Sequence, residues 1–219
     1  MSKAATKWAA AIASSLRLPS VYAFLRSKLV EPQVVIITYH RITPKMEDWS
    51  LESISPSDFE AHIRYFRSNF DILRLDDLVT SVRKRKYLPK PALAITIDDA
   101  YKDIYTWGYP ILRRYSIPAT IFLTTGHVGT RKLLWWDKVS YLVSHTRVTR
   151  LELDEAGTYS LESQKDVPRV AHEIRRKLKR LSDHEKNLIM KKLADVCGVE
   201  VPDEIGAQLL LSWNEVREM

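Results

Sequence analysis

The feature that most constrains the fold is a nearly uninterrupted apolar run, Ala92–Ile97, that ends in two adjacent carboxylates, Asp98 and Asp99. The β-branched residues at positions 95 to 97 favour a strand, and the composition of the run predicts that both faces are buried in a parallel sheet. In sheets built from βα units, ligands and catalytic groups lie at the carboxyl ends of the strands. The run therefore predicts chemistry at Asp98 and Asp99.

Two neighbouring carboxylates can take two different chemical roles. Like charges at close range push their pKa values apart unless a cation lies between them. The pair therefore fits a metal ligand beside a general base that handles protons. Taken alone, the pair also fits an N-cap of the helix that follows, because Asp is a good N-cap residue.

A second candidate site residue, His40, follows the apolar run Val34–Tyr39. This run predicts another buried strand, and a histidine at its carboxyl end can act as an acid or a base near neutral pH. A structural hydrogen bond is the alternative role for His40. Because His40 and Asp98 both follow apolar strands, we expect them to share one edge of the sheet.

The segments between these runs alternate in a regular way. We expect helices from Ser55-Pro56, over 76–86 and over 102–115, the last one kinked at Pro110 with Trp107 facing inward. Short strands are expected at 70–73 and at 119–123, the latter buried. This order predicts parallel βα units, arranged as a barrel or as a doubly wound sheet.

The pattern changes after residue 129. A helix over 133–143, a hairpin with strands at 148–153 and 158–161, and helices over 167–181 and 183–196 are expected, and Ser182 with Glu185 forms a capping box. We interpret 130–205 as an insertion, 31–129 as the first part of the main domain and 206–219 as its continuation. A helix is expected to begin at Trp213.

Composition excludes several classes of site. The chain of 219 residues has a single cysteine, Cys197, so it has no disulfide framework, and none of its six histidines forms a paired metal motif. The net charge is +7, and part of it comes from a basic run over 175–180 that we interpret as a solvated helix face. Residues 1–30 predict a helical segment that packs on the domain or lies on a membrane surface.

Four segments in this order resemble the polysaccharide deacetylase (NodB homology) family, in the branch whose Tyr-His segment lies at the N-terminus. They are Thr-Tyr-His-Arg-Ile at 38–42, Thr-Ile-Asp-Asp-Ala-Tyr at 96–101, the segment 109–123 and the segment 211–219. The resemblance implies a distorted parallel (β/α) barrel and a metal-dependent hydrolase that removes N-acetyl, occasionally O-acetyl, groups from a carbohydrate polymer or glycan.

The resemblance also assigns roles to individual residues. Asp98 matches the general base, Asp99 the metal ligand and His40 the acid that protonates the leaving amine. The implied cofactor is a divalent metal ion, with zinc as the first candidate. Tyr101 and Trp136 are candidates for stacking on a sugar ring, with packing in the core as the alternative.

Two departures from the family pattern are visible. Ile97 and Ala100 replace the usual Phe and Gly, and Ala100 is unfavourable if the turn needs a positive φ. The chain also stops before the His-x-x-x-His metal motif, and Asp99 alone cannot hold a catalytic ion that needs about three protein ligands. We therefore expect a barrel that is incomplete at its C-terminus and a fragment that is metal-poor and inactive by itself; His127 or His145 is the weaker alternative as a ligand.

Two other functions fit the sequence. One is a non-catalytic carbohydrate-binding or scaffold protein that lacks the metal histidines. The other is a basic protein that binds nucleic acid or a membrane surface through 175–180 and 1–30. We expect an acetylated polysaccharide or glycan as the binding partner, and no nucleic acid. We also expect a cytoplasmic location, with peripheral membrane contact through residues 1–30.

Overall fold

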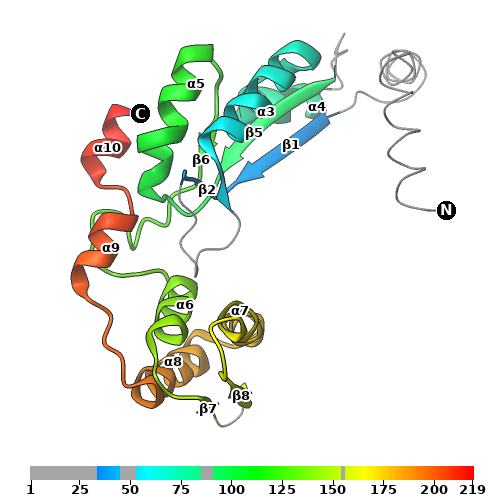
Figure 1. The fold of residues 1–219 in the computed structure, drawn as a ribbon. Coiled ribbons are helices and arrows are strands. Elements are labelled where there is room, and N and C mark those ends of the chain that lie inside the picture. The colour runs from blue at the N-terminus through cyan, green and yellow to red at the C-terminus, as the bar shows by residue number, and fades with distance from the viewer. Residues whose placement is uncertain (1–33, 45–52, 85–90, 154–155) are drawn as a thin grey trace, which may run out of the picture. The chain divides into compact units, whose positions relative to one another are not determined.

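The computed structural model describes residues 34–44, 53–84, 91–153 and 156–219. The expected helical segment 1–30 lies outside these residues. The described residues form two compact units (Figure 1). The first unit takes in 34–39, 57–84, 91–97 and 111–121, and the second takes in 40–44, 53–56, 98–110, 122–153 and 156–219.

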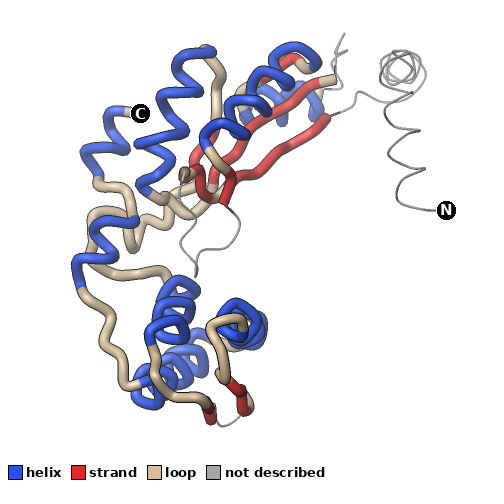
Figure 2. The backbone as a smooth tube through the Cα atoms, in the orientation of Figure 1, coloured by secondary structure: helices blue, strands red, loops and turns tan. Residues whose placement is uncertain are grey.

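A parallel sheet is the centre of the first unit (Figure 2). Strand β5 (Ala92–Ile97) pairs along its whole length with β1 (Val34–Tyr39), and it also pairs with β4 (Asp71–Ile72) and β6 (Thr120–Ile121). All six residues of β5 are buried, as predicted. The parallel α/β class is therefore confirmed, whereas the barrel and its incompleteness remain predictions.

Two of the predicted buried strands are not buried. In β1, Ile36 is 51% exposed, because β1 pairs only with β5 within the described sheet and its faces are partly uncovered. The strand expected at 119–123 shortens to the two half-buried residues of β6, and Phe122 is 52% exposed. An apolar run reports strand propensity in both places, but burial depends on which elements cover it.

Two helices of the first unit match the expected positions. Helix α3 (Pro56–Asn69) buries Phe59 and Ile63, and α4 (Leu75–Arg83) buries Leu78 against Ala92 and Ala94 of β5. His62 of α3 is exposed, and its Nδ1 lies 2.9 Å from the Tyr39 hydroxyl at the end of β1. Burial raises the pKa of Tyr39 to about 12.

The expected helix over 102–115 contains a π-helical turn, η1 (Ile104–Gly108), before α5 (Tyr109–Tyr115). The irregular turn comes directly before Pro110, which has no N–H to donate to the preceding turn. The wider turn also shifts the faces of the helix. Trp107 was expected to face inward and is 42% exposed, so that prediction is wrong, whereas Ile104 and Ile111 are buried.

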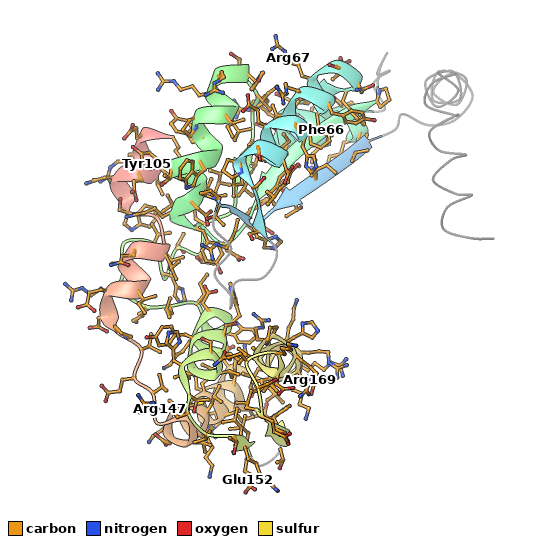
Figure 3. The ribbon with its side chains drawn as sticks, viewed as in Figure 1. Phe66, Arg67, Tyr105, Arg147, Glu152 and Arg169 are labelled. Atoms are coloured by element: carbon orange, nitrogen blue, oxygen red, sulfur yellow. The ribbon has the colours of Figure 1, made fainter. Side chains whose placement is uncertain are left out.

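The core of the second unit brings three helices and a hairpin together. Helices α6 (Trp135–His145), α7 (Asp166–Leu178) and α8 (Asp183–Cys197) pack with strands β7 (Arg150–Glu152) and β8 (Thr158–Ser160) around a shared apolar cluster. The capping box of Ser182 and Glu185 is present, and Gly198 ends α8 with a φ of 59°. Arg169 of α7, which is labelled in Figure 3, pairs with Asp166 and Glu173.

The remaining elements of the second unit are short. Strands β2 (Arg41–Ile42) and β3 (Ser53–Ile54) pair in parallel, and α9 (Asp203–Leu209) was not predicted. Helix α10 (Trp213–Glu218) begins at the predicted residue with the capping box of Ser212 and Glu215. The described helices include none that combines the length and the apolar character needed to cross a membrane. The proposed boundaries at 30, 129 and 205 stay predictions.

Candidate functional site

The turn that carries the two carboxylates has an unusual backbone. Asp99 has a φ of 73° and Ala100 a φ of 61°, so two successive residues with side chains occupy the left-handed region that favours glycine. The Thr124 hydroxyl donates to the Asp99 carbonyl at 3.0 Å, and the Leu211 N–H donates to the Ala100 carbonyl at 3.0 Å. The Ala100 side chain is buried beside Leu211 and Val128. The surrounding segments therefore hold the strained turn in place.

Next to this turn the second unit contains a cavity of about 600 Å³. Its lining residues are His40, Arg41, Asp99, Tyr101, Trp135, Trp136, Asp137, His172, Arg175, Arg176, Lys179 and Lys186. The structure thus brings together four of the five residues singled out by sequence: His40, Asp99, Tyr101 and Trp136. The fifth, Asp98, is half-buried in the turn and is not among the lining residues. The chemical roles assigned to these residues remain predictions.

Tyr101 is the centre of a buried hydrogen-bond network in this cavity. Its hydroxyl donates to Asp137 Oδ2 at 2.7 Å and accepts from Trp136 Nε1 at 2.9 Å. Tyr101 and Asp137 are 3% and 5% exposed. Tyr101 and Trp136, expected to stack on sugar rings, therefore use their polar atoms to fix each other and Asp137, while Trp136 keeps a half-buried ring at the cavity wall.

Burial changes the acidity of both members of the Tyr101–Asp137 pair. It raises the pKa of Asp137 from 3.8 to about 6, although the hydrogen bond from Tyr101 and the positive charge of Arg41 act in the opposite direction. Burial, followed by the neighbouring Asp137 carboxylate, also raises the pKa of Tyr101. Asp137 therefore carries a carboxyl group that titrates near neutral pH inside the cavity.

Arg41, which follows His40, is fixed by a buried ion pair. Its Nε lies 2.7 Å from Asp103 Oδ2, and the two side chains are 8% and 9% exposed. Asp103 also accepts from the Ile42 N–H at 3.2 Å. The Arg41 guanidinium lies over the Tyr101 ring, 4.7 Å from its centroid. This arrangement orients the segment that carries His40 and adds a fixed positive charge to the cavity.

The donor set for a metal ion is incomplete in the described part of the chain. No group of three His, Cys, Asp or Glu side chains among these residues is arranged to hold an ion. His127 and His145, the alternative ligands, do not line the cavity, and His145 stacks on the Tyr141 ring at 3.9 Å. Asp99 by itself does not fit a catalytic metal, which needs about three protein ligands.

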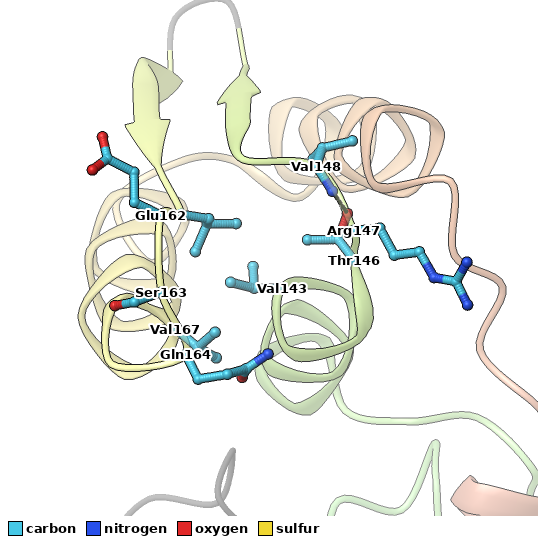
Figure 4. A pocket seen from close by; sticks show the side chains of 9 residues that line it. Val143, Thr146, Arg147, Val148, Glu162, Ser163, Gln164 and Val167 are labelled. Carbon is cyan, nitrogen blue, oxygen red and sulfur yellow. Dashed lines mark hydrogen bonds between the residues drawn. The ribbon is translucent and has the colours of Figure 1, made fainter.

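A second cavity of the same unit, about 430 Å³ in volume, lies among α6, α7 and the segments next to β7 and β8 (Figure 4). Its lining side chains are Val143, Thr146, Arg147, Val148, Leu161, Glu162, Ser163, Gln164 and Val167. It contains a single carboxylate, Glu162, and no histidine. The first cavity is therefore the better candidate for acid and base chemistry.

Comparison with known proteins matches the same region of the chain. The family model described as polysaccharide deacetylase matches residues 85–183, which include the Asp98–Tyr101 turn and Trp136. The resemblance to polysaccharide deacetylases is confirmed. A deacetylase-like relative from Staphylococcus aureus, named poly-beta-1,6-N-acetyl-D-glucosamine N-deacetylase, is 39% identical over 89 residues, or 40% of this chain and 30% of that protein. The protein of the same name from Staphylococcus epidermidis is 33% identical over 79 residues, 36% of this chain and 27% of the relative.

Solved structures are also similar to this chain. IcaB from Ammonifex degensii is 19% identical, with a TM-score of 0.42 over 75% of this chain and 83% of that one. The Streptococcus pyogenes deacetylase PplD, solved in complex with acetate, is 22% identical, with a TM-score of 0.41 over 44% of this chain and 45% of that one. The chain spans about 30% of the length of the curated staphylococcal relatives that it matches.

Sequence reasoning missed Arg41 and Asp137, which line the cavity, and Asp103, which holds Arg41 in place. The available signals were local. Arg41 directly follows His40, and Asp137 interrupts the apolar stretch that contains Trp135 and Trp136. Asp103 gave no signal, because a single acid at the start of a helix is ordinarily explained by the helix dipole.

Proposed function

We propose that this chain is part of a hydrolase that removes N-acetyl groups from a polymer containing N-acetylglucosamine. The observation that carries the proposal is that the family match includes the Asp98–Tyr101 turn, and that Asp99 from this turn lines one cavity with His40. The staphylococcal relatives of this chain are named as N-deacetylases of poly-beta-1,6-N-acetyl-D-glucosamine. The O-acetyl alternative receives no separate support from these names.

In this proposal the chain's own groups move two protons. Asp98 accepts a proton from the water whose oxygen attacks the acetyl carbonyl carbon, and His40 then donates a proton to the amide nitrogen as the C–N bond breaks. The products are acetate and a free amine on the sugar. The role of Asp98 as base rests on its place beside Asp99 and on the resemblance, whereas His40 has direct access to the cavity.

A divalent metal ion, with zinc as the first choice, would polarise the acetyl carbonyl and lower the pKa of a bound water when the full set of ligands is present. Asp99 is the proposed ligand on this chain, and the described residues do not complete the set. We therefore propose that ligands from outside the described residues are required, and that the 219-residue chain by itself turns over slowly.

Acetate release from a hexamer of β-1,6-linked N-acetylglucosamine tests this proposal. The 219-residue chain is compared, with zinc added to both, with the longest product encoded by its gene. We expect release by the longer product and at least about tenfold slower release by the 219-residue chain, because a metal site with too few ligands is not held in place. Equal rates would contradict the shortage of ligands, and no release from either would contradict the deacetylase assignment.

A non-catalytic carbohydrate-binding protein is the second candidate, and the incomplete donor set among the described residues favours it. The same comparison separates the two functions. Such a protein binds the hexamer at the aromatic wall of the cavity and releases no acetate in either form. The cytoplasmic location and the membrane contact through residues 1–30 remain predictions.

A further inference from the structure

The cavity beside Asp99 has a wall of positive charge. Three cations, Arg175, Arg176 and Lys179, line it from one face of α7 and its C-cap, and His172 lies at the same helical spacing. Lys186 of α8 and Arg41 add two more cations, against two carboxylates, Asp99 and Asp137. The basic run over 175–180 was expected to be a solvated helix face; part of it instead faces the candidate site.

Three of these cations are already engaged. Arg41 pairs with Asp103 at 2.7 Å. Arg175 Nη1 donates to the Ser140 hydroxyl at 2.8 Å, which ties α7 to α6. Lys186 pairs with Asp183 at 2.9 Å and lies over the Trp135 ring. These contacts explain why three positive charges are held at the cavity by the fold itself.

Arg176 and Lys179 differ from the other three. Both are exposed, and within the described part of the chain neither side chain makes a hydrogen bond or an ion pair, although the Lys179 backbone N–H donates to the Arg175 carbonyl at 2.9 Å. Two neighbouring cations on one helix face repel each other slightly, so the arrangement is unfavourable unless an anion or solvent screens it. A bound anionic group would gain charge-assisted hydrogen bonds from both side chains.

The same cavity also has an aromatic lining. Trp135 and Trp136 of α6 lie with their rings 5.5 Å apart and nearly perpendicular, and both line the cavity. A half-buried indole offers a flat apolar surface of the kind that packs on a sugar ring. The cavity therefore combines a surface for a sugar ring with a cationic surface for a negative group.

We infer that the substrate is an acidic glycan, in which N-acetylglucosamine units lie next to sugars that carry a carboxylate, sulfate or phosphate. This inference rests on the proposed function and specifies its substrate class. Arg176 and Lys179 bind the acidic group while the acetylated sugar lies toward Asp99. A cavity of about 600 Å³ has the size of a site for one or a few sugar units rather than for an extended nucleic-acid backbone.

The inference is tested, without requiring turnover, by comparing the binding of one acidic and one neutral hexasaccharide. Hyaluronan hexasaccharide, with alternating N-acetylglucosamine and glucuronate, is compared with chitohexaose by titration calorimetry on the 219-residue chain. We expect hyaluronan to bind about tenfold or more tightly at about 0.05 M salt, and the difference to shrink at about 0.5 M salt as the charges are screened. Equal affinities for the two hexasaccharides at low salt would overturn the inference.

Paired variants locate the effect. The double variant Arg176→Gln with Lys179→Gln is expected to bind the two hexasaccharides with affinities within about twofold of each other. The control, Arg180→Gln with Lys191→Gln, removes the same charge from exposed residues that do not line the cavity and should keep the preference. Loss of the preference in the control as well would overturn the assignment to this wall.

Two further ligands test whether the cavity prefers an acidic glycan over a simple anion or a nucleic acid. Sodium sulfate at matched ionic strength and a single-stranded DNA of twelve nucleotides are titrated in the same way. We expect both to bind more weakly than hyaluronan, because sulfate has no ring to pack on the indoles and DNA joins its phosphates to small furanose rings in place of the pyranose rings of a glycan. Sulfate or DNA that binds as tightly as hyaluronan would contradict an acidic glycan, in favour of a simple anion site or a nucleic-acid site. These affinities stay informative even if no acetate is ever released.

Discussion

At the scale of single residues, the turn after β5 stores backbone strain next to the candidate site. Asp99 and Ala100 both have positive φ values, and Ala100 stands where the family pattern has glycine. The left-handed conformation costs a residue with a side chain roughly 1–2 kcal/mol. The strain fixes the direction in which the chain leaves Asp99, which lines the cavity.

Replacing Ala100 by glycine measures this strain. Ala100→Gly loses a buried methyl worth about 0.8 kcal/mol and adds chain entropy, but it removes the positive-φ cost, so we expect a change in unfolding free energy near zero. The matched control Ala94→Gly, in buried β5, lacks the relief and should cost about 1.5 kcal/mol. Urea unfolding measures both; equal losses would show that the turn carries no strain.

Asp137 supplies a pH dependence of known sign. Because burial raises its pKa to about 6, the native state holds a proton that the unfolded state releases between about pH 4 and pH 6. The free energy of unfolding therefore falls as pH rises through this window. Asp137→Asn lacks this titration. The free energy of unfolding of the variant minus that of the unaltered chain therefore rises with pH, by at most roughly 3 kcal/mol, and is constant above about pH 6.

Unfolding in urea at about pH 4, 5 and 7 checks the prediction for Asp137. The control is Asp195→Asn, a change at an exposed carboxylate of α8. Its stability should parallel that of the unaltered chain. A constant difference between Asp137→Asn and the unaltered chain across this range would contradict the assigned titration.

The residues at strand ends could be predicted, and those delivered by distant helices could not. His40 and Asp99 follow apolar strands, and the structure places both at one cavity. Asp137, Arg176 and Lys179 reach the same cavity only because α6 and α7 pack together. The spacing of the basic residues on α7 was visible in the sequence, but spacing alone does not show what a helix face meets.

At the scale of elements, α10 closes over the strained turn. Val216 and Met219 pack on the cluster of Ala100, Val128 and Leu211. The Tyr105 hydroxyl donates to Glu218 at 2.7 Å, and Lys102 lies 3.4 Å from Glu215. A helix of six residues is marginal by itself, so its caps and these contacts determine whether it forms.

Removing the N-cap of α10 is expected to loosen this cover. Ser212 Oγ accepts from the Glu215 N–H at 3.3 Å, and Ser212→Ala should cost about 1 kcal/mol. Hydrogen exchange at Glu215 and Val216 should accelerate at the same time. Ser68→Ala, at an exposed residue inside α3, is the control and should cost no more than about 0.5 kcal/mol. A larger loss at Ser68 than at Ser212 would contradict the role of the cap.

Elements with local signals were predicted, and features set by tertiary neighbours were not. The capping boxes at Ser182 and Ser212 mark α8 and α10 in the sequence because the signal lies within four residues. The exposure of β1 and the short β6 depend on neighbouring segments and could not be deduced from apolar runs. The π-helical turn before Pro110 replaced the kink that the proline predicts.

At the scale of the whole molecule, a stretch of the chain is similar to polysaccharide deacetylases. The family match covers residues 85–183, and the described residues supply Asp99 and His40 to one cavity without a complete metal donor set. The parallel α/β class followed from the alternation of apolar runs and helices. A barrel could not be established in this way, because closure depends on strands and register that such an alternation does not specify.

We propose that deacetylation takes place at the cavity beside Asp99. Acetate release from the β-1,6-linked N-acetylglucosamine hexamer, measured on the longest gene product with added zinc, tests it through Asp99→Asn, with Asp195→Asn as control. We expect Asp99→Asn to release acetate about 100-fold or more slowly, and the control to stay within about twofold of the unaltered protein. An Asp99→Asn protein that releases acetate as fast as the control would show that the cavity beside Asp99 is not the site of deacetylation.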